Sequence, residues 1–257
     1  MKVVILAGGY GTRLSEETAN IPKPLVEIAG KPLIWYILKA YASQGFNDFI
    51  IACGYKGDKL KNYFMSLAHS SNDFTIDVSK NRTEVLNSKV PDWKVTLIDT
   101  GLNTMTGGRI KRLKKYIDGD TFMLTYGDGV SDVDLKALLR FHKAHGRKAT
   151  LTAVRMPRFG ILNIEGKGKV TSFQEKRLDQ SPFINGGFMV LSKSVIDYID
   201  DDKTSFETYP LQKLAEEGEL YAFKHEGFWK AVDNIRDKQE LEKIMESDDP
   251  RVKLWKD

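Results

Sequence analysis

The sequence predicts an α/β protein, in which a mainly parallel mixed sheet carries helices on both faces and is followed by a β-rich part. Over residues 1–146, apolar runs of strand length alternate with segments of helical periodicity, which is typical of parallel strands joined by helical crossovers. Over residues 147–257, short strand-like runs follow one another with turns between them before helices return. No repeat or linker interrupts the chain, so we expect one domain over residues 1–257, made of these two parts.

The first part supplies the expected parallel strands and their crossovers. Apolar or alternating runs predict strands at 2–5, 49–53, 74–78, 95–99 and 121–126. Helices are predicted at 33–44, 58–64, 106–117 and 132–146. Gly45 stops the first of these helices, and Gly57-Asp58 starts the second. Thr106 and Asp132 are the expected N-caps of the third and fourth. Residues 79–94 show no clear period.

The second part is predicted to begin with strands. They are expected at 149–154, 161–164, 169–175, 185–191 and 220–225, with a hairpin turn at 165–168. Helices are expected at 195–199, 206–217 and 234–246. Ser205 is the expected N-cap of the second of these helices, and Gly218 ends it.

Composition and charge narrow the class of protein. The 257 residues are 41% hydrophobic and 29% charged, as in ordinary globular proteins, and no apolar run reaches the roughly 20 residues that span a bilayer. Met1-Lys2 leads straight into the first strand, which leaves no room for a signal peptide. The net charge of +4 is dispersed, without a basic stripe interleaved with aromatics. The single Cys53 lies in an apolar run and is interpreted as a core thiol. We expect a cytoplasmic protein with no membrane or nucleic acid partner.

A glycine-rich loop follows the first predicted strand directly. From Leu6 to Leu14 the chain reads Leu-Ala-Gly-Gly-Tyr-Gly-Thr-Arg-Leu. Glycines let backbone amides approach a ligand closely, and Arg13 adds a guanidinium, so the loop suits phosphate groups. A dinucleotide-binding fingerprint would need glycine in place of Leu14, and a P-loop would need a Gly-Lys-Ser/Thr ending. The loop therefore predicts a phosphate site of another type, with a plain turn as the alternative.

Three further charged residues stand in settings that favour function. Lys23 lies between two prolines, which hold it on a stiff, extended segment. Asp128 lies between two glycines at the end of a predicted strand, at the sheet edge that would also carry the glycine loop. Asp233 follows an apolar run and precedes the last predicted helix. The alternative for Lys23 is a solvated loop lysine, for Asp128 an aspartate in an ordinary turn, and for Asp233 a helix N-cap. None of the four histidines stands in a triad-like or metal-like setting.

The order and spacing of these motifs resemble the sugar-1-phosphate nucleotidylyltransferase family. Matching pieces span nearly the whole chain, at 6–14, 22–24, 30–32, 127–129, 173–176, 184–188 and 229–233. Within the family, the sequence is most similar to the cytidylyltransferase branch, on the stretches 99–101 with 105–109, 125–130, 141–146 and 149–153. Segment 103–109 departs from the Gly-Leu-Gly-like or Gly-Leu-Ala-Gln-like segment that many thymidylyl- and uridylyltransferases carry opposite the base.

The resemblance implies a fold and a reaction. The fold is a Rossmann-like nucleotidyltransferase core in residues 1–146 with a sugar-binding part in residues 147–257. In the reaction, a sugar 1-phosphate oxygen attacks the α-phosphate of a nucleoside triphosphate and pyrophosphate leaves. For the cytidylyl branch, the implied substrates are CTP and glucose 1-phosphate, with Mg²⁺ as cofactor. A homo-oligomer, with a hexamer among the options, and a role in supplying deoxysugars for surface polysaccharide are also implied.

Two alternatives to this function stay open. One is the same chemistry with another nucleotide or another sugar phosphate. The other is a non-catalytic regulator that binds sugar nucleotides, which predicts the loss of Arg13, Lys23, Asp128 or Asp233; all four are present.

The resemblance also implies roles for individual residues. Catalysis is implied for Arg13, Lys23 and Asp128, and Mg²⁺ ligation for Asp128 and Asp233. The implied nucleotide-binding set is Leu6, Ala7, Gly8, Gly9, Gly11, Thr12, Arg13, Lys23, Thr104, Thr106, Arg109 and Gly127. The implied sugar-phosphate-binding set is Glu175, Lys176, Asn185, Gly186 and Gly187. Arg13 would hold the β- and γ-phosphates and Lys23 the α-phosphate, while Thr104, Thr106 and Arg109 would meet the base. For Glu175 and Lys176 the alternative is a surface ion pair.

Overall fold

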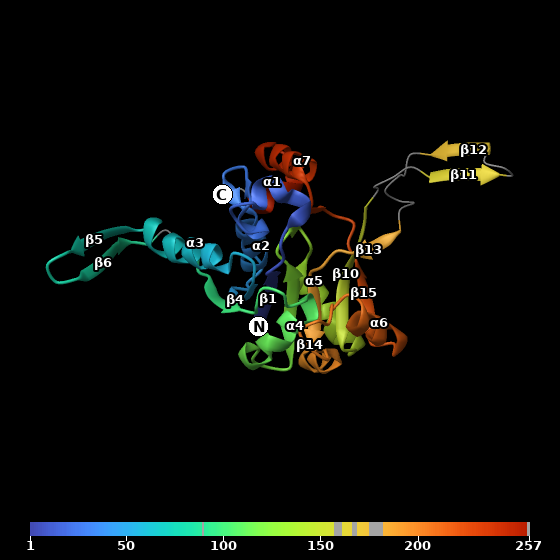
Figure 1. Cartoon of the computed structure of the whole chain (residues 1–257), viewed down its shortest axis with the longest axis horizontal. Helices are drawn as coiled ribbons and strands as arrows, with labels where there is room; N and C mark the ends of the chain where they lie inside the picture. Colours follow the sequence, from blue (N-terminus) through green and yellow to red (C-terminus); the bar gives the residue numbers. More distant parts are fainter. Residues whose placement is uncertain (89, 157–160, 166–168, 175–181, 256–257) are drawn as a thin grey trace.

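The computed structural model describes residues 1–88, 90–156, 161–165, 169–174 and 182–255, and its centre is a mixed sheet (Figure 1). Four neighbouring strands are parallel, in the spatial order β7 (Lys94–Asp99), β4 (Asp48–Cys53), β1 (Lys2–Ala7) and β8 (Thr121–Tyr126). Beyond β8 the sheet continues with antiparallel β14 (Met189–Ser192), then β10 (Ala149–Arg155), with which β13 (Phe183–Asn185) and β15 (Leu220–Lys224) also pair. The predicted mixed, mainly parallel sheet is confirmed.

The path of the chain through this sheet defines an edge for a site. From β1 the chain steps outward to β4 and β7, and it then returns to add β8 on the other side of β1. The carboxyl ends of the four parallel strands therefore lie at one edge, and β1 and β8 flank the point where the winding reverses. Open α/β sheets bind ligands at such points. The loops that follow Ala7, Asp99 and Tyr126 all leave the sheet here.

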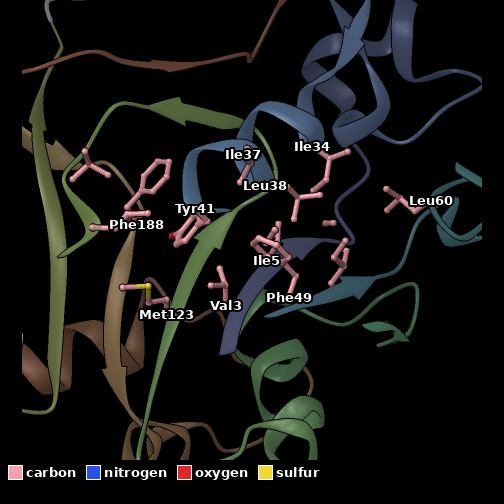
Figure 2. Close-up of a cluster of buried hydrophobic side chains, with 14 of the residues drawn as sticks. Val3, Ile5, Ile34, Ile37, Leu38, Tyr41, Phe49, Leu60, Met123 and Phe188 are labelled. Atoms are coloured by element: carbon pink, nitrogen blue, oxygen red, sulfur yellow. The ribbon is translucent and has the colours of Figure 1, made fainter. Parts of the chain in front are cut away.

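Helices cover both faces of the sheet because successive side chains of a strand point to opposite faces. Val3 and Ile5 of β1 belong to one apolar cluster, whereas Val4 and Leu6 belong to the other. The first cluster is covered by α2 (Leu33–Ala42), α3 (Gly57–Ser70) and α5 (Leu135–His145). The second is covered by α4 (Thr106–Leu113), the 3₁₀ helix η5 (Lys193–Tyr198) and α6 (Tyr209–Glu216). Figure 2 shows side chains of α2 against those of the sheet, among them Ile34, Ile37, Leu38, Tyr41, Val3, Ile5 and Phe49.

A third apolar cluster joins the end of the chain to its beginning. In it, α7 (Ile235–Glu246) and the 3₁₀ helix η6 (Pro250–Trp255) pack against α2 and against the small ribbon of β2 (Glu27–Ile28) and β3 (Lys31–Pro32). A second ribbon pairs β9 (Gly129–Ser131) antiparallel with β16 (Trp229–Ala231). The remaining short helices are η1 (Thr12–Leu14), α1 (Ser15–Thr18), η2 (Lys23–Leu25) and η3 (Lys114–Tyr116). Among the described residues, no helix is both long enough and apolar enough to cross a bilayer.

Two hairpins stand away from the central sheet (Figure 1). The first pairs β5 (Asp73–Asp77) with β6 (Arg82–Asn87), and the second pairs β11 (Ile161–Glu165) with β12 (Lys169–Gln174). The strand predicted at 74–78 thus exists but pairs with β6, which was not predicted, and does not join the parallel sheet. The first hairpin exposes several large apolar side chains: Phe74, Ile76, Val78, Val85 and Leu86. Three positions of the turn expected at 165–168 lie outside the described residues.

Several predicted element ends were wrong. Asp134, not Asp132, caps α5 and accepts a hydrogen bond from the Ala137 amide at 2.7 Å. Thr106 is the first residue of α4 and not its cap. The helix expected at 206–217 begins at Tyr209, because the preceding residues form a loop that binds α4, and the helix expected at 195–199 is the 3₁₀ helix η5.

The strand expected at 185–191 is interrupted. It divides into β13 and β14, with a break at 186–188. There Gly187 (φ 73°) and Phe188 (φ 45°) adopt left-handed backbone conformations, which a continuous strand does not allow. Both halves still pair with β10.

Candidate active site

A cavity of about 460 Å³ lies at the carboxyl edge of the parallel strands. It is bounded by the loops that follow β1, β7 and β8, together with Lys23 and Asp233 from other segments. Of the predicted nucleotide, catalytic and metal residues, all line it: Leu6, Ala7, Gly8, Gly9, Gly11, Thr12, Arg13, Lys23, Thr104, Thr106, Arg109, Gly127, Asp128 and Asp233. The fold therefore brings into one hollow residues that are spread over most of the sequence.

The glycine loop after β1 leaves no room for larger residues at two of its positions. A Cβ atom on Gly8 would collide with the Arg109 guanidinium. Gly11 has a φ of +65°, and a Cβ there would lie 2.9 Å from Cγ2 of Thr18. At Gly9, by contrast, a Cβ would meet nothing within 4 Å, so this position faces open space. The loop is thus packed against the protein at its ends and open at Gly9.

One lysine and one arginine form ion pairs with two carboxylates inside the cavity. Nζ of Lys23 lies 2.7 Å from Oδ2 of Asp128 and 3.0 Å from Oδ1 of Asp233. Nη1 of Arg13 lies 3.0 Å from Oδ2 of Asp233. The side chain of Arg13 is 70% exposed, whereas those of Lys23 and Asp233 are each 13% exposed. Arg13 can therefore turn towards a ligand, while Lys23 is held between the carboxylates.

Backbone pairing explains how distant parts of the chain build this cluster. In the β9–β16 ribbon, Ala231 lies opposite Gly129, and the Val232 amide donates to the Asp128 carbonyl at 3.0 Å. Asp233 follows at once and therefore lies beside Asp128. Its amide donates to Oδ2 of Asp237 at 3.1 Å.

The alternative role of Asp233 as an N-cap is not what the structure shows. Asn234 is the N-cap of α7, since its Oδ1 accepts from the Asp237 amide at 2.9 Å. The carboxylate of Asp233 is turned instead towards Arg13 and Lys23.

The chemistry of this pair of carboxylates fits a hard divalent cation. Asp128 and Asp233 both contact the same ammonium group, so they are close enough to share one cation, and a lysine cation already occupies the place between them. Mg²⁺ uses few protein carboxylates and completes its shell with phosphate oxygens and water. Among the described residues, no group of three or more His, Cys, Asp or Glu side chains could hold a metal. A metal held by these two carboxylates would have room for phosphate oxygens and water in its shell.

Arg109 and Thr106 line the cavity with polar atoms that already have protein partners. The buried guanidinium of Arg109 donates to the hydroxyl of Thr100 and to several backbone carbonyls, those of Gly8, Cys53, Gly101 and Leu102. Burial, with a smaller contribution from Arg112, lowers the Arg109 pKa. The Thr106 hydroxyl donates to Glu207 and accepts from the Phe206 amide. Thr104 is buried at 8% exposure. Their contacts with a base stay predictions.

A second hollow of about 360 Å³ adjoins the first through a shared residue. It is lined by Met156, Ile184, Trp229, Ala231 and Asp233, and Asp233 also lines the first cavity. Its other lining residues come from the second half of the chain, next to the predicted sugar-phosphate residues. The carboxylate of Asp233 therefore stands where the two hollows meet.

The predicted sugar-phosphate residues are only partly visible. Oδ1 of Asn185 accepts from the Gly187 amide at 2.9 Å, and its Nδ2 donates to the Tyr126 hydroxyl at 3.3 Å. The Gly186 carbonyl accepts from Nε1 of Trp229 at 2.8 Å. Gly186 thus contacts Trp229, which lines the second hollow, but none of Asn185, Gly186 and Gly187 is among the residues that line either hollow. Glu175 and Lys176 lie outside the described residues.

Comparison with known proteins adds an independent finding. The family model described as nucleotidyl transferase matches residues 2–247. The chain belongs to the nucleotidyl transferase family. The match covers nearly the whole chain, so the predicted family resemblance is confirmed.

Individual relatives of this nucleotidyl transferase agree in length and fold. The chain is 54% identical to a glucose-1-phosphate cytidylyltransferase of Salmonella typhi, over 99% of this chain and 100% of that protein. It is 43% identical, with the same coverage, to a probable glucose-1-phosphate cytidylyltransferase of Bacillus subtilis. Its structure is similar to the crystal structure of HddC from Yersinia pseudotuberculosis complexed with GMP-PN, with a TM-score of 0.72 and 28% identity over 95% of this chain and 99% of that chain.

Sequence reasoning left out several polar residues of this nucleotidyl transferase, among them Tyr10 and Asn103, which line the cavity and share a hydrogen bond, and also Tyr126 and Glu207. Tyr126 lines the cavity, and its hydroxyl donates to Glu207 at 2.8 Å. Burial, followed by the nearby Glu207 carboxylate, raises the pKa of Tyr126. Tyr126 could have been suspected, since it directly precedes Gly127-Asp128. Glu207 stands in no motif, and no local signal points to it.

Proposed function

We propose that the chain transfers the cytidylyl group of CTP to glucose 1-phosphate and produces CDP-glucose and pyrophosphate. The observation that carries the proposal is the cluster of Lys23, Asp128, Asp233 and Arg13 at the junction of the two hollows. A triphosphate in the first hollow and a sugar phosphate in the second would bring their reacting groups together at Asp233. The named activity of the relative with 54% identity supports the choice of CTP and glucose 1-phosphate.

The proposed chemistry needs positioning and charge neutralisation and no covalent nucleophile. An oxygen of glucose 1-phosphate forms a bond to the α-phosphorus of CTP as the bond from that phosphorus to the β-phosphate oxygen breaks. Because both substrates are anions, bringing them within bonding distance is the main electrostatic cost. We propose that Lys23, which is flanked by two prolines, meets the α-phosphate, and that the exposed Arg13 neutralises the leaving pyrophosphate.

We further propose that Asp128 and Asp233 hold Mg²⁺. Members of this family use a divalent metal, and the two carboxylates suit a cation that also binds phosphate oxygens. When bound, the metal would supply positive charge next to the phosphates. The glycine loop would contribute the amides of Gly8, Gly9, Gly11 and Thr12, with Leu6 and Ala7 bordering the nucleoside. On the sugar side, Glu175 and Lys176 would bind glucose 1-phosphate beside Asn185, Gly186 and Gly187.

A substrate panel tests this function. The purified chain is incubated with each of CTP, UTP, dTTP, ATP and GTP, in combination with several sugar 1-phosphates and Mg²⁺, and pyrophosphate and sugar nucleotide are measured. We expect CDP-glucose from CTP and glucose 1-phosphate to form fastest. A clear preference for UTP or dTTP would overturn the cytidylyl assignment, and binding without turnover of any pair would favour the regulator.

We also propose that the protein is a homo-oligomer, of which a hexamer is the size that the resemblance suggests. The support is the β5–β6 hairpin, which exposes Ile76 at 56%, Val78 at 84% and Leu86 at 59%. Apolar surface of this kind is frequent at interfaces between proteins. Light scattering coupled to size-exclusion chromatography measures the mass directly, and a single monomeric species would overturn this proposal.

The setting of the reaction is proposed on chemical grounds. Nucleoside triphosphates are too polar to cross a bilayer unaided, so we propose that the enzyme works in the cytoplasm, as one domain with a nucleotide half and a sugar half. The β10 and β14 strands of the second half lie in the same sheet as the strands of the first, which supports the single domain. On the ground of the family resemblance, we also propose that CDP-glucose supplies deoxysugars for surface polysaccharide. Neither nucleic acid nor membrane is a proposed partner.

A further inference from the structure

Glu207 holds two residues of the cavity wall from a position behind them. It lies in the loop between η5 and α6, and its carboxylate accepts three hydroxyl groups. Oε2 accepts from Thr106 at 2.6 Å and from Ser205 at 2.8 Å, and Oε1 accepts from Tyr126 at 2.8 Å. Thr106 and Tyr126 line the cavity, whereas Glu207 does not. One carboxylate therefore controls two hydroxyl groups that a ligand can meet.

The direction of the Thr106 hydrogen bond is fixed by its backbone neighbour. The Phe206 amide lies 2.9 Å from Oγ1 of Thr106, and a backbone N–H can only donate, so Oγ1 must accept there. The single hydroxyl hydrogen then goes to Glu207, at 2.6 Å. A hydroxyl has one hydrogen and two acceptor lone pairs. Thr106 thus has one lone pair left, and it can offer a ligand only an acceptor.

The same argument fixes the direction at Tyr126. The Gly187 amide donates to Oδ1 of Asn185, which places the Asn185 NH₂ group towards the Tyr126 hydroxyl. The Tyr126 oxygen accepts from it, and its hydrogen goes to Glu207. Two hydrogen-bond chains, each set by a backbone amide, therefore end on one carboxylate. Both chains end in a hydroxyl hydrogen, so the residue at position 207 must accept hydrogen bonds without donating any, as a carboxylate does.

The position of α4 does not depend on Glu207. The Asp202 carbonyl accepts from the Met105 amide at 2.8 Å, and the Thr204 carbonyl accepts from the Gly107 amide at 3.0 Å. A Cβ on Gly107 would lie 2.6 Å from that Thr204 oxygen, so the loop and the helix are already in close contact. What Glu207 adds is the orientation of the hydroxyl hydrogens.

We infer that Glu207 and Thr106 together select cytosine by offering an acceptor to its 4-amino group. This inference rests on the proposed cytidylyl transfer. Cytosine carries an NH₂ donor at position 4, where uracil and thymine carry a carbonyl oxygen. The lone pair that Thr106 retains accepts from the amino group and repels the carbonyl oxygen. Glu207 is a positioning residue, because it acts by taking the Thr106 hydrogen.

The test measures base discrimination, as the ratio of kcat/KM for CTP to kcat/KM for UTP, each with glucose 1-phosphate. Glu207→Leu removes both acceptor oxygens at similar size, so that the Thr106 hydrogen loses its partner and is free to point into the cavity. Thr106→Val removes the hydroxyl at nearly constant volume. We expect the CTP to UTP ratio to fall about ten-fold or more in both variants, through loss for CTP and gain for UTP. Thr106→Ser, which keeps the hydroxyl, should retain the ratio of the unmodified protein.

Ser205→Ala provides the matched control. It removes another donor to the same Oε2 atom without touching Thr106, so the ratio should not change. An unchanged ratio in Glu207→Leu and Thr106→Val variants that still turn over CTP would overturn the inference. If Glu207→Leu does not fold, as judged by circular dichroism, Thr106→Val against Thr106→Ser decides alone. Absence of CTP turnover by the unmodified protein would instead count against the proposed function.

Discussion

Nζ of Lys23 lies 2.7 Å from Oδ2 of Asp128, although the two residues are 105 positions apart in the chain. The same ammonium group reaches Asp233, so a lysine occupies the position between the two proposed metal ligands. The two carboxylates that contact this ammonium group repel each other, and in a half-buried setting water screens the repulsion only in part. A positive charge between them offsets that repulsion. If Asp128 and Asp233 hold a metal as proposed, Lys23 and that metal would compete for one place.

Replacing Lys23 should therefore strengthen metal binding while it weakens catalysis. In Lys23→Met, we expect Mn²⁺ to bind the nucleotide-free protein several-fold more tightly, measured by the loss of the free Mn²⁺ signal in electron paramagnetic resonance. If the ammonium group stabilises the transition state, kcat should fall while KM stays nearly unchanged. Lys31→Met, which removes an exposed lysine outside the cavity, is the control and should change neither. Unchanged or weaker Mn²⁺ binding in Lys23→Met would contradict the competition.

Asp128→Asn should abolish turnover and leave the fold intact. The amide has the size of the carboxylate but no charge, so a divalent cation loses an anionic ligand, while Lys23 keeps Asp233 as a partner. Steady-state kinetics at saturating Mg²⁺ and circular dichroism check the two parts. Asp118→Asn changes an aspartate that is 81% exposed and should behave like the unmodified protein. Near-normal activity of Asp128→Asn would count decisively against the metal role.

Gly8→Ala and Gly9→Ala should differ in stability, although they are neighbours. The methyl group on Gly8 would collide with the buried guanidinium of Arg109, whereas that on Gly9 would meet open space. We expect Gly8→Ala to reduce the free energy of unfolding by about 1–3 kcal/mol, as overpacking of a filled site does. Gly9→Ala should stay within about 1 kcal/mol of the unmodified protein. Urea denaturation measures both, and equal values would show that Arg109 yields without cost.

His142 should make the protein less stable as the pH falls. Burial, and to a lesser extent the neighbouring His145, lowers the pKa of His142 from 6.5 to about 4. Between pH 6.5 and about pH 4, His142 is protonated in the unfolded chain but not in the folded chain. Its contribution to the free energy of unfolding is therefore fully present above pH 6.5 and is lost as the pH falls towards 4. The urea midpoint should drop between pH 7 and pH 5. A His142→Gln variant cannot titrate there, so its midpoint should change less over the same range; an identical drop would assign the effect to other groups.

The parts of this fold that local sequence determines were predictable. The buried strands β1, β4 and β8 show as apolar runs, and the loop after β1 shows as closely spaced glycines, because these signals are local. The parallel order of the strands then places Asp128 at the same edge as the glycine loop. The exposed β5–β6 hairpin was harder to foresee, since its apolar residues look like those of a core strand.

The part of the site that long-range pairing determines was not predictable. Asp233 could be either an N-cap or a ligand until the β9–β16 ribbon was known, because that pairing, and not its neighbours, turns it towards Lys23. Glu207 contacts Thr106 and Tyr126 across 101 and 81 positions of chain, and nothing near it in sequence signals either contact. Contacts of this kind leave no periodicity and no motif.

Arg109 joins the loops at the ends of three adjacent strands. Its guanidinium holds the carbonyl of Gly8 after β1, the carbonyl of Cys53 at the end of β4, and those of Gly101 and Leu102 after β7. A ligand that displaces the phosphate loop must either break its hydrogen bond to Arg109 or carry the neighbouring loop with it. If the loop after β1 binds the triphosphate and the loop after β7 meets the base, as proposed, Arg109 couples the two ends of the cavity mechanically.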